Sequence, residues 1–401
     1  MLVDACEVFA DGDWVESKDQ SPEGIRLIQT GNVGKGVFKD RGEKARYISE
    51  ATFKRLRCTE IFEGDCLISR LPDPVGRSCL LPETGERMIT AVDCTIVRFN
   101  PKQLLPEFFN FYSQSDDYLK AVDAETTGTT RKRISRSKLG QAAIPLPPLP
   151  EQQRIVGILD EAFEGIATAK TNAEKNLQNA RALFESHLES VFTRRGPGWV
   201  ENKLKSLTTK IGSGVTPRGG EESYKSEGVS LIRSLNVHDL GFRYPKLAFL
   251  DDAQADNLSN VEVQRRDVLL NITGASVARC CIVPEDVFPA RVNQHVSIIR
   301  PIAEKLDADF LHYLLISKPY KDQLLQTGAE GGSTRQAITK AQIQDFSVKY
   351  PATLKEQKSI VAKLDAMLAE TQCLESLYQR KLAALEALKK SLLHQAFNGK
   401  L

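Results

Sequence analysis

The chain has 401 residues, of which 41% are hydrophobic and 26% charged, a composition typical of a globular protein with room for two or three domains. Its 54 basic and 52 acidic residues give a net charge of only +2, which neither requires nor excludes a nucleic-acid partner. The N-terminal segment is acidic, unlike a secretory signal, and no apolar run approaches the roughly 18 residues of a membrane span. We therefore expect a cytoplasmic protein that does not enter a membrane.

The eight cysteines are scattered and form no CxxC pair, while Cys280 and Cys281 are adjacent. Zinc sites and disulfide frameworks require other spacings. We expect eight reduced thiols in a reducing compartment.

An internal repeat organises the chain. The segment EGIRLIQTGNV, residues 23–33, alternates apolar and polar positions like a half-buried strand, and it returns as EGVSLIRSLNV at residues 227–237. Further matches follow in unbroken order, pairing 62–82 with 264–284, 95–99 with 297–301, and 128–135 with 332–339. The sequence therefore predicts a tandem duplication that produces two homologous domains.

Each half ends in a long helical pattern. EQQRIVGILD from Glu151 and EQKSIVAKLD from Glu356 share six of ten positions, and apolar residues then recur at alternating spacings of four and three. This spacing is typical of helices that pair with a partner helix, although each stripe could instead pack on its own domain. The residues predicted to pair are Ile155, Leu159, Ile166, Leu177, Phe184, Ile360, Leu364, Leu374, Leu385 and Leu392.

No catalytic constellation is visible in the sequence. It contains no phosphate-binding GxxxxGK[ST] loop, no NPPY or DPPY tetrapeptide of adenine methyltransferases, and no histidines at metal-ligand spacing. We expect a non-catalytic protein without a metal or cofactor of its own.

The most basic stretch is 129–138, TTRKRISRSK, with five Lys or Arg and no acid. Clustered cations and small hydroxyls suit contacts with DNA phosphates, and its copy near residue 335 retains an arginine. A solvated basic turn is the alternative interpretation. With polar residues of the neighbouring loops, the candidate DNA contacts are Gln29, Asn32, Lys35, Arg70, Arg77, Thr130, Arg131, Lys132 and Arg133 in the first half, and Thr216, Arg218, Arg233, Asn236, Asn271, Arg279, Thr334, Arg335 and Gln336 in the second.

The repeat, the PLPPLPEQQRIVGILD run at residues 145–160 and the closing SLLHQAFNGKL together resemble the specificity (S) subunits of type I restriction-modification systems, the HsdS family. The resemblance covers essentially the whole chain. It implies an α+β fold, with two α/β target-recognition domains separated by two long antiparallel coiled-coil helices in pseudo-two-fold arrangement. The implied segments are a first recognition domain (1–150), a central spacer helix (151–195), a second recognition domain (196–354) and a C-terminal spacer helix (355–401).

The resemblance also implies the function and partners. Each domain would recognise one half of a bipartite double-stranded DNA target, and the helices would set the gap between the halves. Two modification subunits would use S-adenosylmethionine for N6-adenine methylation, and restriction subunits would use ATP and Mg²⁺, so these cofactors belong to other chains.

GSGVTP at residues 212–217 matches the usual opening loop of a recognition domain, whereas the first half lacks this text, which predicts an abbreviated N-terminal domain. The two halves also differ at candidate contacts, since Arg70 aligns with Ile272. This difference favours two domains that recognise different DNA sequences. A coiled-coil adaptor that scaffolds a multi-protein complex is the alternative hypothesis.

Overall fold

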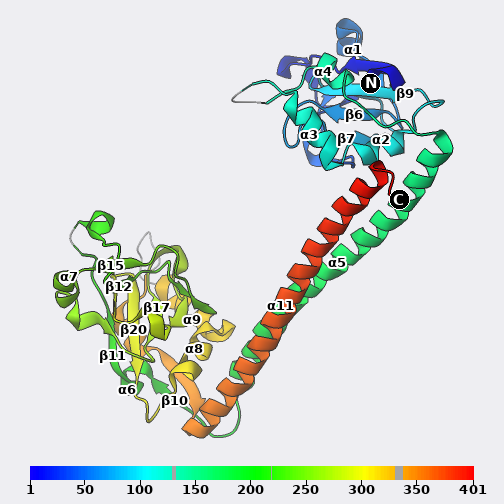
Figure 1. The fold of residues 1–401 in the computed structure, drawn as a ribbon. Coiled ribbons are helices and arrows are strands. Elements are labelled where there is room, and N and C mark those ends of the chain that lie inside the picture. Colours follow the sequence, from blue (N-terminus) through cyan, green and yellow to red (C-terminus); the bar gives the residue numbers. More distant parts are fainter. Residues whose placement is uncertain (129–131, 218, 330–336) are drawn as a thin grey trace. The chain divides into compact units, whose positions relative to one another are not determined.

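The computed structural model describes residues 1–128, 132–217, 219–329 and 337–401 (Figure 1). These residues form two compact units. Unit 1 comprises Met1–Glu174 with Gln379–Leu401, and unit 2 comprises Lys175–Tyr378. Each unit thus contains one half of the repeat together with a portion of both long helices.

Unit 1 contains two sheets, one of four strands in the order β1-β9-β6-β7 and one of five in the order β2-β4-β3-β8-β5. All pairings are antiparallel except that of β3 with β8. The strands are β1 (Cys6–Asp11), β2 (Gln20–Ser21), β3 (Ile25–Ile28), β4 (Tyr47–Ile48), β5 (Glu60–Ile61), β6 (Cys66–Ser69), β7 (Ser78–Leu80), β8 (Met88–Thr90) and β9 (Cys94–Phe99).

Short helices with clear start signals cover these sheets. Pro106 occupies the first turn of α2, where its missing N–H costs no hydrogen bond. The hydroxyls of Ser115 and Ser135 accept from backbone N–H groups and cap α3 and α4. The helices are α1 (Glu50–Leu56), α2 (Pro106–Tyr112), α3 (Asp116–Ala124), α4 (Arg136–Gly140) and the long α5 (Leu149–Arg194).

Unit 2 repeats this plan with sheets β11-β20-β17-β18 and β15-β12-β19-β16, and β12 and β19 again run parallel. Two small sheets, β13-β14 and β10-β21, are added. The strands are β10 (Trp199–Lys203), β11 (Thr208–Ser213), β12 (Val229–Ile232), β13 (Val237–His238), β14 (Gly241–Phe242), β15 (Ala248–Leu250), β16 (Glu262–Val263), β17 (Val268–Asn271), β18 (Cys280–Ile282), β19 (Ala290–Val292), β20 (Val296–Pro301) and β21 (Ser347–Pro351). The helices are α6 (Leu204–Leu207), α7 (Asp252–Asp256), α8 (Ala308–Ile316), α9 (Lys318–Ala329), α10 (Lys340–Asp345) and the long α11 (Leu354–Phe397).

The duplication extends to single hydrogen bonds. Arg70 N donates to Asp93 O at 2.9 Å in unit 1, and Ile272 N donates to His295 O at 3.0 Å in unit 2. Both long edge pairs, β1 with β9 and β11 with β20, carry a register shift near their starts. The predicted α+β class with two homologous domains is confirmed.

The expected abbreviation of the first domain needs a correction. β1 of unit 1 leads into Gly12 at the place where β11 leads into Gly214, and both glycines pack closely against backbone carbonyls, so the opening turn is present despite its different text. A counterpart of β10 is what unit 1 lacks among its described residues.

The two long helices pair antiparallel within each unit. In unit 1, Lys170 Nζ donates to Glu386 Oε1 at 2.8 Å, and in unit 2 Arg181 Nε donates to Glu375 Oε2 at 3.1 Å. Apolar residues of α5 and α11 share the core of each unit. Nine of the ten predicted pairing residues are buried or half-buried, namely Ile155, Leu159, Ile166, Leu177, Phe184, Ile360, Leu364, Leu385 and Leu392.

Leu374 is the exception, and its assignment to the seam is wrong. Its side chain is 37% exposed, whereas Thr371 is 2% exposed and directs its hydroxyl back to Met367 O and Leu368 O. After Thr371 the less exposed positions are Glu375 and Tyr378, so Glu375 takes the inward place that was predicted for Leu374. The leucine spacing alone could not reveal that Thr371 and Glu375 are less exposed than Leu374.

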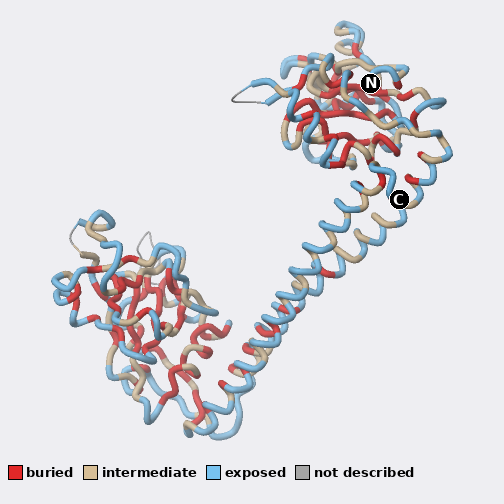
Figure 2. The backbone as a smooth tube through the Cα atoms, in the orientation of Figure 1, coloured by how far each residue is buried: buried red, intermediate tan, exposed pale blue. Residues whose placement is uncertain are grey.

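Buried residues concentrate in the sheets and in the helices packed on them, while the long helices are exposed on most of their surface (Figure 2). All eight cysteines are free thiols, and Cys373 alone is exposed. Among the described residues, no helix combines the length and apolar character needed to cross a membrane.

Candidate nucleic-acid interface

In each unit the candidate loops meet at one edge. The parallel strands β3 and β8 end there in unit 1, and β12 and β19 end there in unit 2. Hydrogen bonds join the loops, as when Asp13 N donates to Thr90 O at 2.7 Å and Gly214 N donates to Asn293 O at 3.1 Å. We call these surfaces the first loop edge (12–16, 29–46, 70–77, 91–93 and the described part of 126–136) and the second loop edge (214–217, 233–246, 272–279, 293–295 and 337–338).

Asn32 and Asn236 support these edges from inside. Asn32 Oδ1 accepts from Gln29 N at 3.0 Å and its amide donates to Lys39 O at 2.9 Å. Asn236 makes the same two bonds with Arg233 N and Arg243 O, at 3.0 and 2.8 Å. Both side chains are buried, and backbone groups occupy the oxygen and the nitrogen of each amide, so they fix a turn. The prediction that they contact DNA does not fit their positions.

Arg77 is also used within the fold. Its guanidinium donates to the backbone carbonyls of Val33, Leu71, Pro74 and Thr30 at 2.7–2.9 Å, and burial lowers its pKa. In unit 2 the carbonyl that corresponds to Thr30 is that of Ser234, and it is bound by Asn271 Nδ2 at 2.8 Å. Arg279, which aligns with Arg77, is therefore not needed to bind this carbonyl, and it lies half-buried at the surface. Arg77 and Asn271 are structural, whereas Arg279 remains a candidate contact.

Arg70 is buried as well, with its guanidinium on Val92 O and, at 3.1 Å, on Asp11. Burial lowers its pKa, and among the described residues its Nε has no hydrogen-bond partner. We leave Arg70 out of the proposed interface.

In the folded chain, acidic side chains lie beside the described part of the basic stretch 129–138, although the stretch itself contains no acid. Lys132 pairs with Asp123 at 2.9 Å, Arg133 with Asp93 at 3.0 Å and Lys138 with Glu125 at 3.1 Å. These are exposed pairs, and such pairs contribute only about 0–1 kcal/mol, so Lys132 and Arg133 can exchange a carboxylate for a phosphate.

The unpaired cations of the first loop edge lie elsewhere. No ion pair within the described residues involves the exposed Lys35, Lys39, Arg41, Lys44 or Arg46. Partial desolvation of its ammonium group lowers the pKa of Lys35. Arg41, Lys44 and Arg46 line a pocket of about 380 Å³ together with Gln29 and Asn32. Of these residues, Gln29, Asn32 and Lys35 were predicted. Arg41, Lys44 and Arg46 were not predicted, because acids and bases alternate in the segment KDRGEKAR. In the described part of the folded chain, Asp40 pairs with the buried Arg26 and not with these cations.

At the corresponding position of the second loop edge, the basic side chain is engaged in contacts within the protein. Arg233, which aligns with Gln29, pairs with Glu221 at 2.6 Å, donates to Lys246 O at 2.7 Å and stacks over the ring of Tyr224. The carboxylate of Glu221 thus already pairs with the Arg233 guanidinium.

The second loop edge instead carries a hydrogen-bonded network of polar side chains. Thr216 Oγ1 donates to Gln294 Oε1, Gln294 Nε2 lies 3.1 Å from His295 Nε2, and His295 Nδ1 lies 2.6 Å from Thr273 Oγ1. Gln294, His295 and Thr273 were not predicted. No periodicity or charge cluster marks them, since they come from separate loops.

The remaining candidates, Thr130, Arg131, Arg218, Thr334, Arg335 and Gln336, lie outside the described residues.

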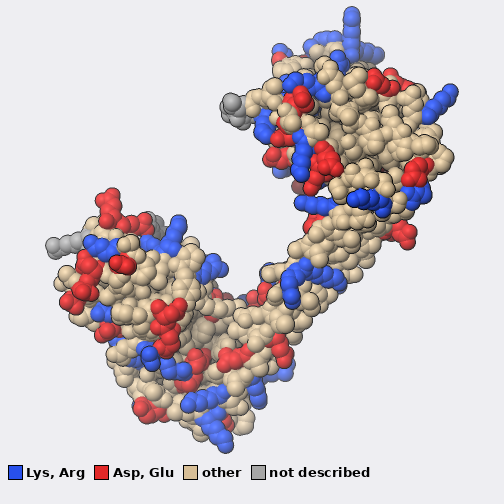
Figure 3. All heavy atoms as spheres, in the orientation of Figure 1, with Lys and Arg blue, Asp and Glu red and all other residues tan. Residues whose placement is uncertain are grey.

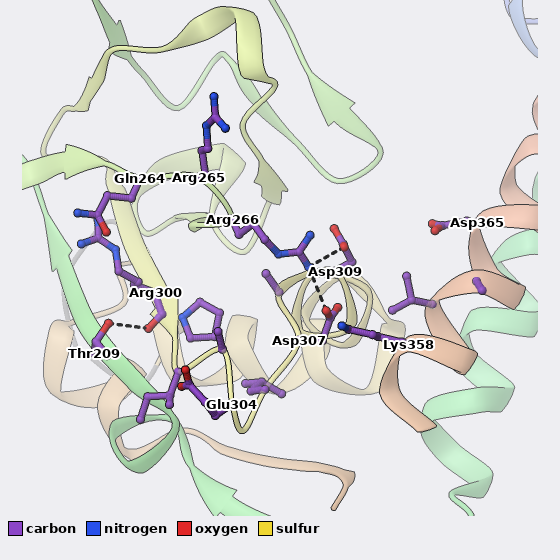
Figure 4. Close-up of a pocket in the computed structure, with 17 residues that line it drawn as sticks. Thr209, Gln264, Arg265, Arg266, Arg300, Glu304, Asp307, Asp309, Lys358 and Asp365 are labelled. Atoms are coloured by element: carbon purple, nitrogen blue, oxygen red, sulfur yellow. Dashed lines mark hydrogen bonds and ion pairs between the residues drawn. The ribbon is translucent and has the colours of Figure 1, made fainter. Parts of the chain in front are cut away.

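A larger pocket of about 740 Å³ lies at the opposite end of the unit 2 strands, beside α8 and the start of α11 (Figure 4). Its charges are largely satisfied internally, since Arg266 pairs with Asp307 and Asp309 at 3.0 and 2.8 Å, and Arg300 pairs with Asp267 at 2.7 Å. This pocket is remote from the second loop edge along the strands, because the lining residue Pro301 ends β20 whereas Gln294 precedes this strand.

Acidic and basic side chains are interspersed on the visible face of both units (Figure 3). Contacts with a polyanion would therefore depend on local clusters. In the part of the chain that the structure describes, no three His, Cys, Asp or Glu side chains are grouped so that they could hold a metal ion.

Comparisons with known proteins agree with this arrangement. The family model for the type I restriction modification DNA specificity domain matches twice, at residues 4–178 and 198–382. The chain is 25% identical over 316 residues to the Escherichia coli type I restriction enzyme EcoBI specificity subunit, covering 73% of this chain but only 65% of that subunit. It is 23% identical over 420 residues to the putative MjaX specificity subunit of Methanocaldococcus jannaschii, covering 100% of this chain and 92% of that protein.

Solved structures show the same fold at low sequence identity. A chain from a study of complex assembly and conformational transition of the type I R-M system superposes with a TM-score of 0.77 at 20% identity, covering 100% of this chain and 97% of that one. The HsdS subunit from Thermoanaerobacter tengcongensis gives a TM-score of 0.59 at 20% identity, with coverages of 100% and 96%. With two family matches that span most of its length, one over each half of the repeat, the chain belongs to the type I restriction-modification DNA specificity family.

Proposed function

We propose that this chain is the non-catalytic DNA-specificity subunit of a type I restriction-modification complex. The observation that carries this proposal is the pair of loop edges, which share one backbone scaffold but present different side chains. The first offers Arg41, Lys44 and Arg46, which form no ion pair with any described residue, and the second offers Gln294 within a polar network. One scaffold with two surfaces suits recognition of a bipartite site whose halves differ.

Partner subunits would supply the chemistry. We assign S-adenosylmethionine to two modification subunits, and ATP with Mg²⁺ to restriction subunits, because the sequence lacks the corresponding motifs. The long helices offer a surface for such partners, since Leu183, Leu374 and Leu377 expose 37–51% of their area on the unit 2 portion. Exposed leucines on a paired helix are typical of a helical docking surface.

The test combines the purified chain with its modification subunits and maps methylated adenines in genomic DNA, with and without this chain. We expect a bipartite motif that depends on the chain, and binding to that duplex that weakens steeply with salt. Partner assembly without any DNA sequence preference would replace this proposal with the adaptor function. Methyl transfer by the chain alone would contradict its non-catalytic role.

A further inference from the structure

The turn that precedes β20 holds an exposed glutamine on a fixed backbone. His295 O accepts from Ile272 N at 3.0 Å, and His295 N donates to Asn293 Oδ1 at 3.0 Å, while Asn293 is itself buried. Gln294 lies between them with its side chain at the surface. A polar side chain on such a turn loses little freedom when it binds a partner.

The amide of Gln294 is also oriented. Thr216 donates its hydroxyl to Oε1, so Nε2 faces His295. With Oε1 toward Thr216, the contacts are satisfied when His295 accepts from the amide at Nε2 and donates from Nδ1 to Thr273 Oγ1. The threonine and the histidine thus hold both ends of the amide and restrict its rotation.

Within the described part of the chain, these contacts leave one amide hydrogen and one oxygen lone pair of Gln294 available. That combination matches adenine in the major groove, where the N6 amino group donates and N7 accepts. Guanine presents two acceptors at the same edge, and one end of a fixed amide would then oppose a like group.

Unit 1 has different chemistry at the matching turn. Hydrogen-bond correspondence places Val92 at the position of Gln294 and Asp93 at that of His295, since Arg70 N donates to Asp93 O as Ile272 N does to His295 O. Asp93 pairs with Arg133 at 3.0 Å. The same turn therefore presents an apolar side chain and an ion pair in one unit, and an oriented amide in the other.

We propose that Gln294 contacts the adenine of one A·T pair in the half-site bound by unit 2, and that Thr216 and His295 are positioning residues for its amide. This inference rests on the proposed function and adds a specificity-determining residue to it.

The test uses the full chain in complex with its modification subunits and measures methylation motifs and competition binding on a panel of duplexes varied at each half-site position. Gln294→Ala should reduce discrimination at a single position of one half-site by about 5- to 150-fold, the range of a bidentate base contact. Gln294→Glu, which can only accept, should shift that position from adenine toward cytosine. Thr216→Val should weaken the same preference by a smaller factor.

Gln323→Ala provides the matched control, because Gln323 is an exposed glutamine of the same unit on helix α9. It should leave the motif unchanged. An unchanged motif for Gln294→Ala would overturn the inference. So would a uniform loss over all sequences with a shallower salt dependence, which indicates a phosphate contact. Absence of any bipartite preference in the wild-type complex would instead overturn the proposed function itself.

Discussion

Gln152 and Gln357 make the same three hydrogen bonds in the two units. Gln152 Oε1 accepts from Leu105 N at 2.9 Å, and its Nε2 donates to Gln103 O and Pro147 O, both at 2.8 Å. Gln357 repeats this set with Asp307 N, Lys305 O and Pro351 O at 2.7, 3.0 and 2.9 Å. Both side chains are fully buried, so each ties the start of a long helix to its recognition domain. The EQ dipeptide that reveals the duplication therefore has a structural role.

Replacing this glutamine should destabilise its unit. Gln152→Ala leaves a buried N–H and two carbonyls without partners, and we expect a loss of about 3 kcal/mol in the free energy of unfolding, since each buried unsatisfied group costs roughly 1–3 kcal/mol. Urea unfolding of the full chain measures this. Gln153→Ala is the control, because its side chain is exposed and should change stability by less than about 0.5 kcal/mol. Equal effects of the two substitutions would contradict the role of Gln152.

The first loop edge predicts a separation between binding and stability. Arg41→Ala and Arg46→Ala should each weaken DNA binding by the complex for all sequences alike and reduce the salt slope by about one, as expected when a phosphate contact is lost. Neither should alter unfolding, because both side chains are exposed.

Arg77→Ala should behave in the opposite way. It removes the donor of four bonds to backbone carbonyls, so thermal stability should fall strongly. If Arg77→Ala folded as stably as the wild type and lost only DNA affinity, the structural role of Arg77 would be refuted.

His312 predicts a pH dependence of stability. Burial lowers its pKa, so the folded chain keeps the ring neutral, with Nε2 2.7 Å from Asp239 O. The unfolded chain binds a proton below about pH 6.5, the usual value for histidine. Stability should therefore fall as the pH drops below that value and remain constant with respect to this group above it.

The matched variant is His312→Asn, because Asn110 makes the corresponding bond to Gly36 O at 2.9 Å in unit 1. Its unfolding free energy should vary less between about pH 7 and 5 than that of the wild type. Identical pH profiles for the two proteins would exclude His312 as the source.

The corrected helix seam is tested with two leucines of α11. Leu364 is fully buried and Leu374 is 37% exposed. We expect Leu364→Ala to cost about 2–5 kcal/mol of stability and Leu374→Ala less than about 1 kcal/mol, measured by chemical denaturation. Leu374→Glu should instead reduce the affinity for the modification subunits, measured by titration of the assembled complex. A large loss of stability for Leu374→Ala would restore the leucine to the seam.

The sequence by itself determined the architecture, because the information was local and repeated. Period-two and four-three spacings identify strands and paired helices from neighbouring residues, and the long helices begin at Leu149 and Leu354, within two residues of the predicted starts at 151 and 355. The site was only partly predictable, because its character depends on which side chains meet across the fold. Asn32 and Arg77 have the residue types of DNA contacts, yet backbone groups of the same loops occupy them. The basic stretch has no acid in sequence but acquires Asp93 and Asp123 in space. The network from Thr216 to Thr273 exists only because three separate loops meet at one edge of a sheet, a relationship that tertiary packing alone decided.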